Sequence, residues 1–263
     1  MKIVFLIPGL DVSGGSRVVL ELSEKLCQRG HKVSIVYPYE KNYELHRNFN
    51  ALDLCKKVKY FLAGMPPGRC SWFNSTAKII KVPTLLPEFV PDADIVVATY
   101  WTTAEFLARY PKTKGRKFYL IQGYEIWGGG FEKVINTYSL PFNKIVVSTF
   151  LKKKIQEYTK DPVFGPIIPG VDSKHFNCTN KISGDTYNIG MLHHYLDVKG
   201  VRDGLMALEL VKKDYPRVHV HAYGVVSNDS AAHFSFPCSV DFYNNPPQSL
   251  LPQIYSKCDI WLC

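Results

Sequence analysis

Hydrophobic positions along the chain fall into short continuous runs that alternate with amphipathic segments. Residues 2–8 form an apolar, β-branched run, which predicts a buried strand. The next segment ends at Gly30, a residue type that closes helices, and repeats apolar side chains at helical spacing, at Val18, Val19, Leu22 and Leu26. Residues 31–38 are apolar again. The pattern therefore predicts a strand, a helix and a second strand in a βαβ unit.

The same kind of run recurs through the N-terminal part of the chain. Strands are predicted at residues 58–64, 94–100, 117–123, 144–149 and 164–170, with helical segments at 102–110 and 150–160. These strands are apolar along their length rather than at alternate positions. Continuous apolar strands separated by helices are typical of a parallel sheet that helices cover on both faces.

A polar, turn-rich stretch then interrupts this pattern. Residues 171–186 contain few apolar side chains, which is typical of a linker between domains. Beyond it the pattern restarts, with strands predicted at 188–192, 217–224, 239–244 and 259–263 and helices at 200–216 and 247–258. We therefore expect an N-terminal α/β domain over 1–170, a linker over 171–186 and a partial second α/β domain over 187–263.

The composition fits a folded protein of the cell interior. Of 263 residues, 46% are hydrophobic and 21% charged, and no apolar run approaches the roughly 20 residues of a membrane-spanning helix. The seven cysteines are odd in number and include no C-x-x-C pair, which favours neither a disulfide framework nor a zinc site. We expect a cytoplasmic protein. The net charge of +9 favours nucleotide phosphates, an anionic membrane surface or nucleic acid as partners.

A glycine-rich loop at residues 8–17 joins the first predicted strand to the first predicted helix. Such a loop exposes backbone N–H groups and the positive end of a helix dipole, so it is a candidate anion site. Gly15 stands where the phosphate-binding P-loop needs a lysine, so nucleotide hydrolysis is not expected. The glycines do not have the spacing of the dinucleotide-binding motif G-x-G-x-x-G. The sequence also has no acidic residue at the end of the second predicted strand, where that motif needs one to bind ribose. A plain tight turn at Gly14 and Gly15 stays an open alternative.

A second loop of this kind follows the first strand of the predicted second domain. Residues 190–200 place His193, His194 and Lys199 around the start of the next helix. In parallel α/β sheets, ligands bind at the carboxyl ends of the strands. Two domains that each offer a phosphate-sized site there would face each other across a cleft, which suits a substrate linked through a diphosphate.

Five short motifs, in the same order and spacing, resemble those of the retaining GT-B glycosyltransferases of family 4. They are GGSR at 14–17, IIPGVDSKHF at 167–176, LHHYLDVKG at 192–200, VHAYG at 220–224 and LLPQIYSKCDIWLC at 250–263. The resemblance implies a GT-B fold, with two Rossmann-like domains facing each other across a cleft. It also implies transfer of a hexose-type sugar from a nucleotide-sugar to a glycan or lipid-linked acceptor, with retention of anomeric configuration and without a metal or other cofactor.

The resemblance also implies where such an enzyme works. The donor would bind mainly to the second domain and the acceptor to the first, in the synthesis of a surface polysaccharide or glycolipid. Together with the positive charge, this implies a place at the inner face of the membrane, in peripheral contact with anionic lipid. Nucleic acid is not an expected partner, because the basic residues are dispersed and no recognised binding module is present.

Individual donor-side residues gain candidate roles from the resemblance. Lys199 is the first candidate to bind the donor diphosphate, and His194 is the second. The family usually has an arginine where the alignment places His194, and a histidine is not a permanent charge. Gly14 and Gly15 would let the first loop approach the donor closely, and Arg17 would touch phosphate or acceptor.

Two further loops of the first domain contain candidate residues. Gln122 and Glu125 follow a predicted strand and resemble a family segment near the transferred sugar, so they are candidates for catalysis or for hydrogen bonds to sugar hydroxyls. A structural role for both is the alternative. Tyr100 and Trp101 lie at another strand end, where they would stack on a sugar face, although packing in the core is the commoner use of such rings.

His219 and His221 alternate onto one face of a predicted strand, but no third ligand stands at a suitable spacing, so no metal site is expected. The family's pair of glutamates lies downstream of the last motif, and the sequence ends at Cys263 before it. We therefore expect weakened donor binding and reduced or no activity of this chain alone. A non-catalytic nucleotide-sugar-binding remnant and a nucleotide-sugar epimerase of the same fold stay open as alternatives.

Overall fold

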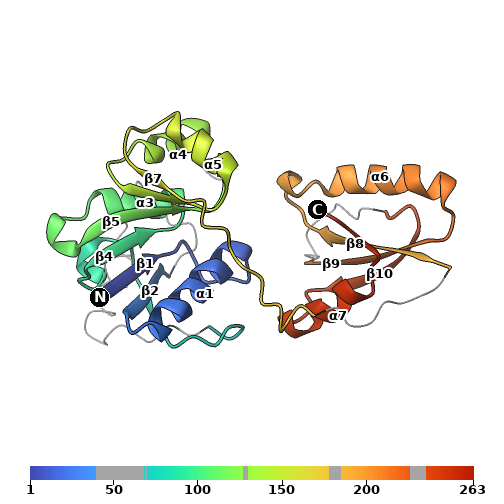
Figure 1. Cartoon of the computed structure of the whole chain (residues 1–263), viewed down its shortest axis with the longest axis horizontal. Coiled ribbons are helices and arrows are strands. Elements are labelled where there is room, and N and C mark those ends of the chain that lie inside the picture. The colour runs from blue at the N-terminus through green and yellow to red at the C-terminus, as the bar shows by residue number, and fades with distance from the viewer. Residues whose placement is uncertain (40–67, 69, 127–129, 178–184, 226–234) are drawn as a thin grey trace, which may run out of the picture. The chain divides into compact units, whose positions relative to one another are not determined.

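A computed structural model of the chain describes residues 1–39, 68, 70–126, 130–177, 185–225 and 235–263. The chain divides into two compact units, Met1–Pro169 and Gly170–Cys263, so the division falls beside the predicted end of the first domain at residue 170 (Figure 1). Each unit contains a parallel sheet with helices packed on it. The predicted α/β fold class is therefore confirmed.

The sheet of the first unit has the strand order β3-β2-β1-β4-β5-β6-β7, and every pair in it is parallel. Its strands are β1 Lys2–Leu6, β2 Lys32–Pro38, β3 Lys78–Val82, β4 Ile95–Ala98, β5 Arg116–Ile121, β6 Asn143–Val146 and β7 Val163–Phe164. Because neighbouring strands are parallel, each connection must cross over the sheet. Short 3-10 turns at Pro87–Phe89 and Lys112–Lys114 precede β4 and β5.

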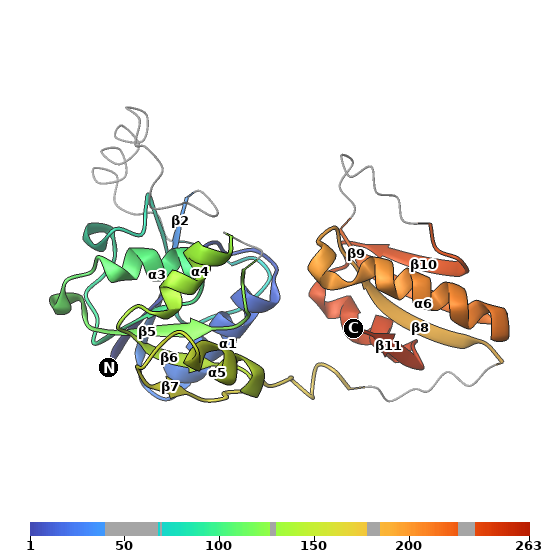
Figure 2. The ribbon, with the colours of Figure 1, turned by 90° about the horizontal axis from the view of Figure 1, so that it is seen from above.

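Helices cover both faces of this sheet (Figure 2). Helix α1, Gly14–Gln28, packs Val19 and Leu20 on the face that carries Ile3, Phe5 and Ile35. The opposite face carries a second core to which three helices contribute, and these are α3 Trp101–Ala108, α4 Phe131–Tyr138 and α5 Thr149–Gln156. Buried side chains on both faces explain why the strands are apolar throughout.

The structure differs from the predicted elements at the sheet edges. The strand predicted over 58–64 lies outside the described residues, and β3 was not predicted because lysines at positions 78 and 81 interrupt its apolar run. Among the described residues it is the outermost strand of its sheet, next to β2, and charged side chains are tolerated at such a position. The strand predicted over 164–170 shrinks to Val163–Phe164, since the prolines at 166 and 169 cannot donate to a ladder. Helix α4 was also not predicted.

The sheet of the second unit has the order β10-β9-β8-β11, again with parallel pairs. Its elements are β8 Tyr187–His193, α6 Val201–Asp214, β9 Val218–Gly224, β10 Ser239–Asn244, α7 Leu251–Ser256 and β11 Ile260–Leu262, with 3-10 turns at Asp197–Lys199 and Gln248–Leu250. Helix α6 packs Leu205 and Leu208 on the face that carries Val218, Val220 and Ala222. The other face carries an aromatic group formed by Tyr223, Tyr255 and Trp261.

Both sheets reverse their strand order once, and the reversals position the candidate loops. In the first sheet the order turns back between β1 and β4, and in the second between β8 and β11. At such a switch point, adjacent connections leave on opposite faces and open a crevice beyond the carboxyl ends of the strands. The glycine-rich loop follows β1, and the loop of His194 and Lys199 follows β8.

Gly224 allows β9 to pass closely beside the end of β8. It pairs in register with His193, and a Cβ added at Gly224 would overlap the carbonyl group of His193. A side chain here cannot swing away, because the obstacle is backbone. The glycine therefore holds the strand end from which the His194 loop starts.

We expect Gly224→Ala to lower the free energy of unfolding by about 2 kcal/mol or more, since the two strand ends must move apart. Urea denaturation monitored by circular dichroism measures the change. Gly170→Ala is the matched control, because a Cβ there meets nothing within 4 Å. Equal stability of the two variants would contradict the close packing at Gly224.

Candidate functional site

The glycine-rich loop ends in a capped and open helix start. The Ser13 side chain accepts a hydrogen bond from the backbone N–H of Ser16 at 3.3 Å, so α1 begins directly after Ser13. A Cβ added at Gly14 meets nothing within 4 Å, and one at Gly15 meets only the Gln122 side chain, at 3.7 Å. The fold itself therefore does not require glycine at either position. Each position has room for at least one added methyl group.

Gln122 is brought to this loop by the sheet. It follows β5, and its Nε2 donates to the carbonyl oxygen of Gly15 at 3.4 Å across 107 residues of sequence. Two residues that the sequence singled out separately thus lie in contact. Arg17, one turn further into α1, forms an ion pair with Glu21 at 2.8 Å. Its guanidinium is directed along the helix in this structure, and reaching a phosphate would mean exchanging that partner.

Glu125 is a buried carboxyl group at the start of another helix. It is 7% exposed, and its Oε2 accepts a hydrogen bond from the backbone N–H of Trp101, the first residue of α3, at 3.3 Å. Burial raises the pKa of Glu125 from 4.5 to about 8, and the bond from Trp101 offsets only part of that rise. The carboxyl group therefore holds a proton at neutral pH, and it cannot serve there as an ionised base or nucleophile.

Tyr100 and Trp101 lie at the same helix start but differ in access. The indole of Trp101 is 2% exposed and belongs to the core under the sheet. It cannot lie against a ligand in this structure, which argues against the predicted sugar contact. Tyr100 is half-buried, with its ring centroid 5.9 Å from that of Trp101. Of the two rings, Tyr100 stays a candidate for contact with a sugar.

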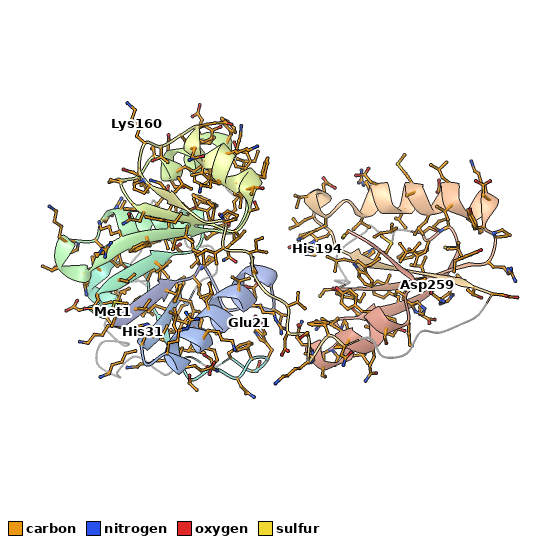
Figure 3. The ribbon with its side chains drawn as sticks, viewed as in Figure 1. Met1, Glu21, His31, Lys160, His194 and Asp259 are labelled. Atoms are coloured by element: carbon orange, nitrogen blue, oxygen red, sulfur yellow. The ribbon has the colours of Figure 1, made fainter. Side chains whose placement is uncertain are left out.

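In the second unit, His194 follows the last residue of β8 and is labelled in Figure 3. Its Nδ1 accepts a hydrogen bond from the backbone N–H of Leu196 at 3.0 Å. Burial lowers the pKa of His194, and the nearby charge of Lys199 lowers it further. The ring is therefore neutral at pH 7, and because Nδ1 is the acceptor, the proton is on Nε2. His194 offers a neutral donor rather than the positive charge of an arginine.

A special backbone turn holds Lys199 directly before the start of α6. The lysine is exposed and ends a 3-10 turn, and Gly200 after it has left-handed dihedral angles, φ 63° and ψ 22°. A side chain at position 200 would be strained, so glycine lets α6 begin directly after the lysine. The loop therefore combines an ammonium group, the Nε2–H of His194 and a helix N-terminus. Asp203 in the first turn of α6 opposes anion binding in part.

The structure thus brings candidate residues together at two places in the first unit and at one in the second. Gly14, Gly15 and Gln122 meet after β1 and β5, and Glu125 meets the backbone of Trp101 after β4. His194 and Lys199 share the loop after β8. The contact between Gln122 and Gly15 and the bond between Trp101 and Glu125 could not be found from the sequence, because no local pattern records which strand ends become neighbours.

Comparison with protein-family models gives no match, and comparison with curated proteins gives none either. Solved structures do match over nearly the whole chain. A mutant of S. aureus TarM in complex with Fondaparinux, alpha-GlcNAc-glycerol and UDP matches with a TM-score of 0.64 and 11% identity, covering 99% of this chain and 80% of TarM. The catalytic domain of starch synthase IV from Arabidopsis thaliana, bound to ADP and acarbose, matches with a TM-score of 0.57 and 12% identity, covering 99% and 77%.

A third match is alpha-glucosyltransferase in complex with UDP and a 13-mer DNA, with a TM-score of 0.56, 13% identity and coverage of 99% and 70%. At these low identities, the structural matches show a shared fold and no more. That fold is GT-B. The expectation that nucleic acid is not a partner gains no support, because this neighbour binds DNA.

Among the described residues, none of the helices has the length and apolar character needed to cross a bilayer.

The buried carboxyl group makes the stability of the protein depend on pH. The folded protein keeps the proton of Glu125 up to about pH 8, whereas the unfolded chain releases it near the ordinary value of 4.5. Stability is therefore highest below the unfolded pKa and falls as pH rises toward the folded pKa, by about 1.4 kcal/mol per pH unit.

We expect Glu125→Gln to flatten this loss between about pH 5 and pH 8, because the amide keeps an acceptor for the Trp101 N–H but does not titrate. Urea denaturation at a series of pH values measures it. Glu209→Gln, on the exposed side of α6, is the control and should keep the wild-type slope. Identical slopes in Glu125→Gln and wild type would show that Glu125 ionises normally.

Proposed function

We propose that the chain is a glycosyltransferase that moves a hexose-type sugar from a nucleotide-sugar to an acceptor, with retention of anomeric configuration. The observation that carries the proposal is the likeness, over nearly the whole chain, to proteins solved with UDP or ADP. In such a transfer a nucleoside diphosphate leaves, so the protein must stabilise its developing charge. A loop with suitable chemistry follows β8.

In this proposal the donor diphosphate binds to the loop of His194 and Lys199. The exposed ammonium of Lys199 supplies a full positive charge, and the backbone N–H groups at the start of α6 add partial charge. His194 donates from Nε2 without having to be charged. When the anion arrives it also raises the pKa of His194, so protonation of the ring would strengthen the contact further.

The first unit contributes the glycine-rich loop and the acceptor side. Gly14 and Gly15 leave room for the close approach of a ligand, and the amide of Gln122 lies beside them for hydrogen bonds to sugar hydroxyls. Glu125 is proposed as a positioning residue rather than a base, because it holds the start of α3 and with it Tyr100. No step in this proposal uses a metal ion.

The acceptor is proposed to be a glycan or a lipid-linked glycan, in the synthesis of a surface polysaccharide or glycolipid. The net charge of +9 supports work at the cytoplasmic face of an anionic membrane. Two of the structural neighbours were solved with acarbose or Fondaparinux bound, and a third with DNA. Acceptor assays therefore include oligosaccharides, lipid-linked sugars and duplex DNA.

Binding and turnover test the proposal together. Isothermal titration with UDP, ADP, GDP and their sugar conjugates should reveal one preferred nucleotide. Release of nucleoside diphosphate in the presence of acceptor should follow, with the anomeric configuration of the product read by NMR. Absence of binding by every nucleotide and nucleotide-sugar would overturn the proposal. Binding without transfer would support a non-catalytic protein, and isomerised free nucleotide-sugar would support an epimerase.

Lys199→Ala is expected to weaken binding of the preferred nucleoside diphosphate by about tenfold or more, since it removes a charge-assisted contact with phosphate. Lys213→Ala, an exposed lysine near the opposite end of α6, is the matched control and should bind like wild type. A loss of the same size in both variants would point to general electrostatic attraction and remove the donor role of Lys199.

Gly15→Ala separates a ligand role of the glycine loop from a purely structural one. The added methyl group fits without a clash and improves helix propensity, so thermal stability should stay equal or rise slightly. Affinity for the nucleotide-sugar should nevertheless fall severalfold, because the methyl group occupies the space of an approaching ligand. Unchanged affinity in this variant would mean that Gly15 only forms a turn.

A further inference from the structure

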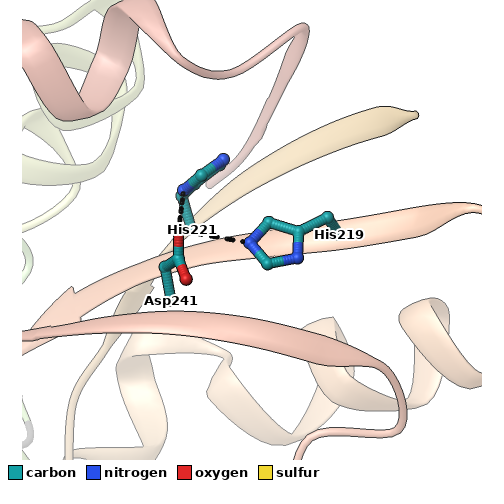
Figure 4. A group of neighbouring side chains, drawn as sticks. All are labelled: His219, His221 and Asp241. Carbon is teal, nitrogen blue, oxygen red and sulfur yellow. Dashed lines mark ion pairs between the residues drawn. The ribbon is translucent and has the colours of Figure 1, made fainter. Parts of the chain in front are cut away.

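His219, His221 and Asp241 meet on one face of the second sheet, apart from the loops described above (Figure 4). Residues two apart on a strand point to the same side, so both histidines of β9 lie opposite the face that α6 covers. The sequence offered no third ligand nearby. Strand pairing supplies it, because Asp241 of β10 pairs in register with His221.

Two of the three separations between ligand atoms are close to those of a tetrahedral zinc site. Asp241 Oδ2 lies 3.3 Å from Nε2 of His219 and 3.5 Å from Nδ1 of His221, and the whole set lies within 4.8 Å. Ligand atoms at zinc distances on tetrahedral corners are about 3.3 Å apart. Octahedral magnesium would bring its neighbouring ligands to about 2.9 Å and favours oxygen over imidazole. The two carboxylate–imidazole separations and the donor types therefore fit zinc better than magnesium.

Neighbouring residues orient His221 as a ligand. The Nδ2 group of Asn188 donates to the carbonyl of Thr186 and to Asp259 Oδ2, both at 3.3 Å, so its Oδ1 is the atom that faces His221 Nε2, also at 3.3 Å. Nε2 must then carry the hydrogen, and Nδ1 carries the lone pair. This lone pair faces the carboxylate of Asp241, which is repulsive unless a proton on Nδ1 or a metal ion lies between them.

The surroundings of Nδ1 support the same assignment. Among the described residues this buried atom has no hydrogen-bond partner. His219 is held in a similar way, because its Nδ1 is hydrogen-bonded to the Ser239 hydroxyl at 2.9 Å while Nε2 faces Asp241. Metal-ligating histidines are usually held through their second nitrogen. Each ring therefore has one nitrogen that faces Asp241 Oδ2.

We propose that His219, His221 and Asp241 bind a zinc ion, with a fourth position open to water. The side chain of Asp241 is 53% exposed and that of His221 is 7% exposed, so the ion would lie at the rim of the sheet with one side toward solvent. The ammonium of Lys257 donates a hydrogen bond to the Tyr243 hydroxyl at 3.0 Å. Its positive charge lies close enough to His221 to disfavour a second positive charge there, so it would repel a bound cation. The affinity is therefore below that of a site without this lysine.

This site is separate from the proposed donor loop of the same unit. His219 pairs with Asn188 near the amino end of β8, five residues before His193. At about 3.3 Å per residue, His219 lies roughly 16 Å from the carboxyl end of β8, and His221, which pairs with Gly190, roughly 10 Å from it. Figure 3 labels His194 and Asp259, which accepts hydrogen bonds from Asn188 near the amino end of β8, at separate places in the second unit. Zinc binding therefore does not depend on the proposed transferase function.

Metal titration of the whole protein tests the site. Protein treated with EDTA and desalted is titrated with ZnSO₄ by calorimetry and with CoCl₂ by visible absorption. We expect one equivalent of zinc, four-coordinate bands for Co²⁺, and a rise in thermal midpoint with added zinc. Absence of stoichiometric binding by either ion would overturn the proposal.

Variants assign the ion to these residues. Asp241→Asn and His219→Ala should each weaken zinc binding by about tenfold or more and remove the thermal shift, with unchanged circular dichroism. Asp214→Asn, on the helix that covers the other face, is the matched control and should bind like wild type. Lys257→Gln should bind zinc severalfold more tightly. Affinity unchanged in both Asp241→Asn and His219→Ala would also overturn the proposal.

Discussion

Parallel pairing of strands is the constraint on which this structure depends. In a parallel sheet every carboxyl end lies at one edge, and each connection must return across a face of the sheet. The helices that make these crossings therefore begin at the same edge, with their N–H groups exposed there. The loops after β1 and β8 are two instances of one geometry, which explains why both units place a helix N-terminus beside the end of their first strand without sharing a sequence motif.

The chemistry of the two loops nevertheless differs. The loop after β8 has a lysine and a neutral histidine at the start of α6, which suits a diphosphate. The loop after β1 has no comparable free cation among its described residues, since Arg17 is paired with Glu21. It offers room, backbone groups and the amide of Gln122. The first loop therefore offers backbone and amide groups, and the second offers a positive charge.

The local pattern of apolar residues predicted the strands well wherever helices cover both faces of the sheet. The βαβ unit over residues 2–38, the division near residue 170 and both candidate loops could be recognised, because continuous apolar runs and glycine turns are local signals. β3 was missed because its lysines at 78 and 81 mark an edge strand. Contacts between distant residues, such as Gln122 with Gly15 or Asp241 with His221, were also missed. They depend on register, which no short window of sequence records.

The position of Asp241 has a consequence for the mechanics of the second unit. β10 is the outermost strand of its sheet among the described residues, and its Asp241 and Ser239 side chains contact the histidines of β9. Outer strands are the first to fray, because only one flank is hydrogen-bonded. Binding of the ion and pairing of β10 with β9 would then be coupled. Loss of the ion would weaken the pairing of β10, and separation of β10 from β9 would release the ion.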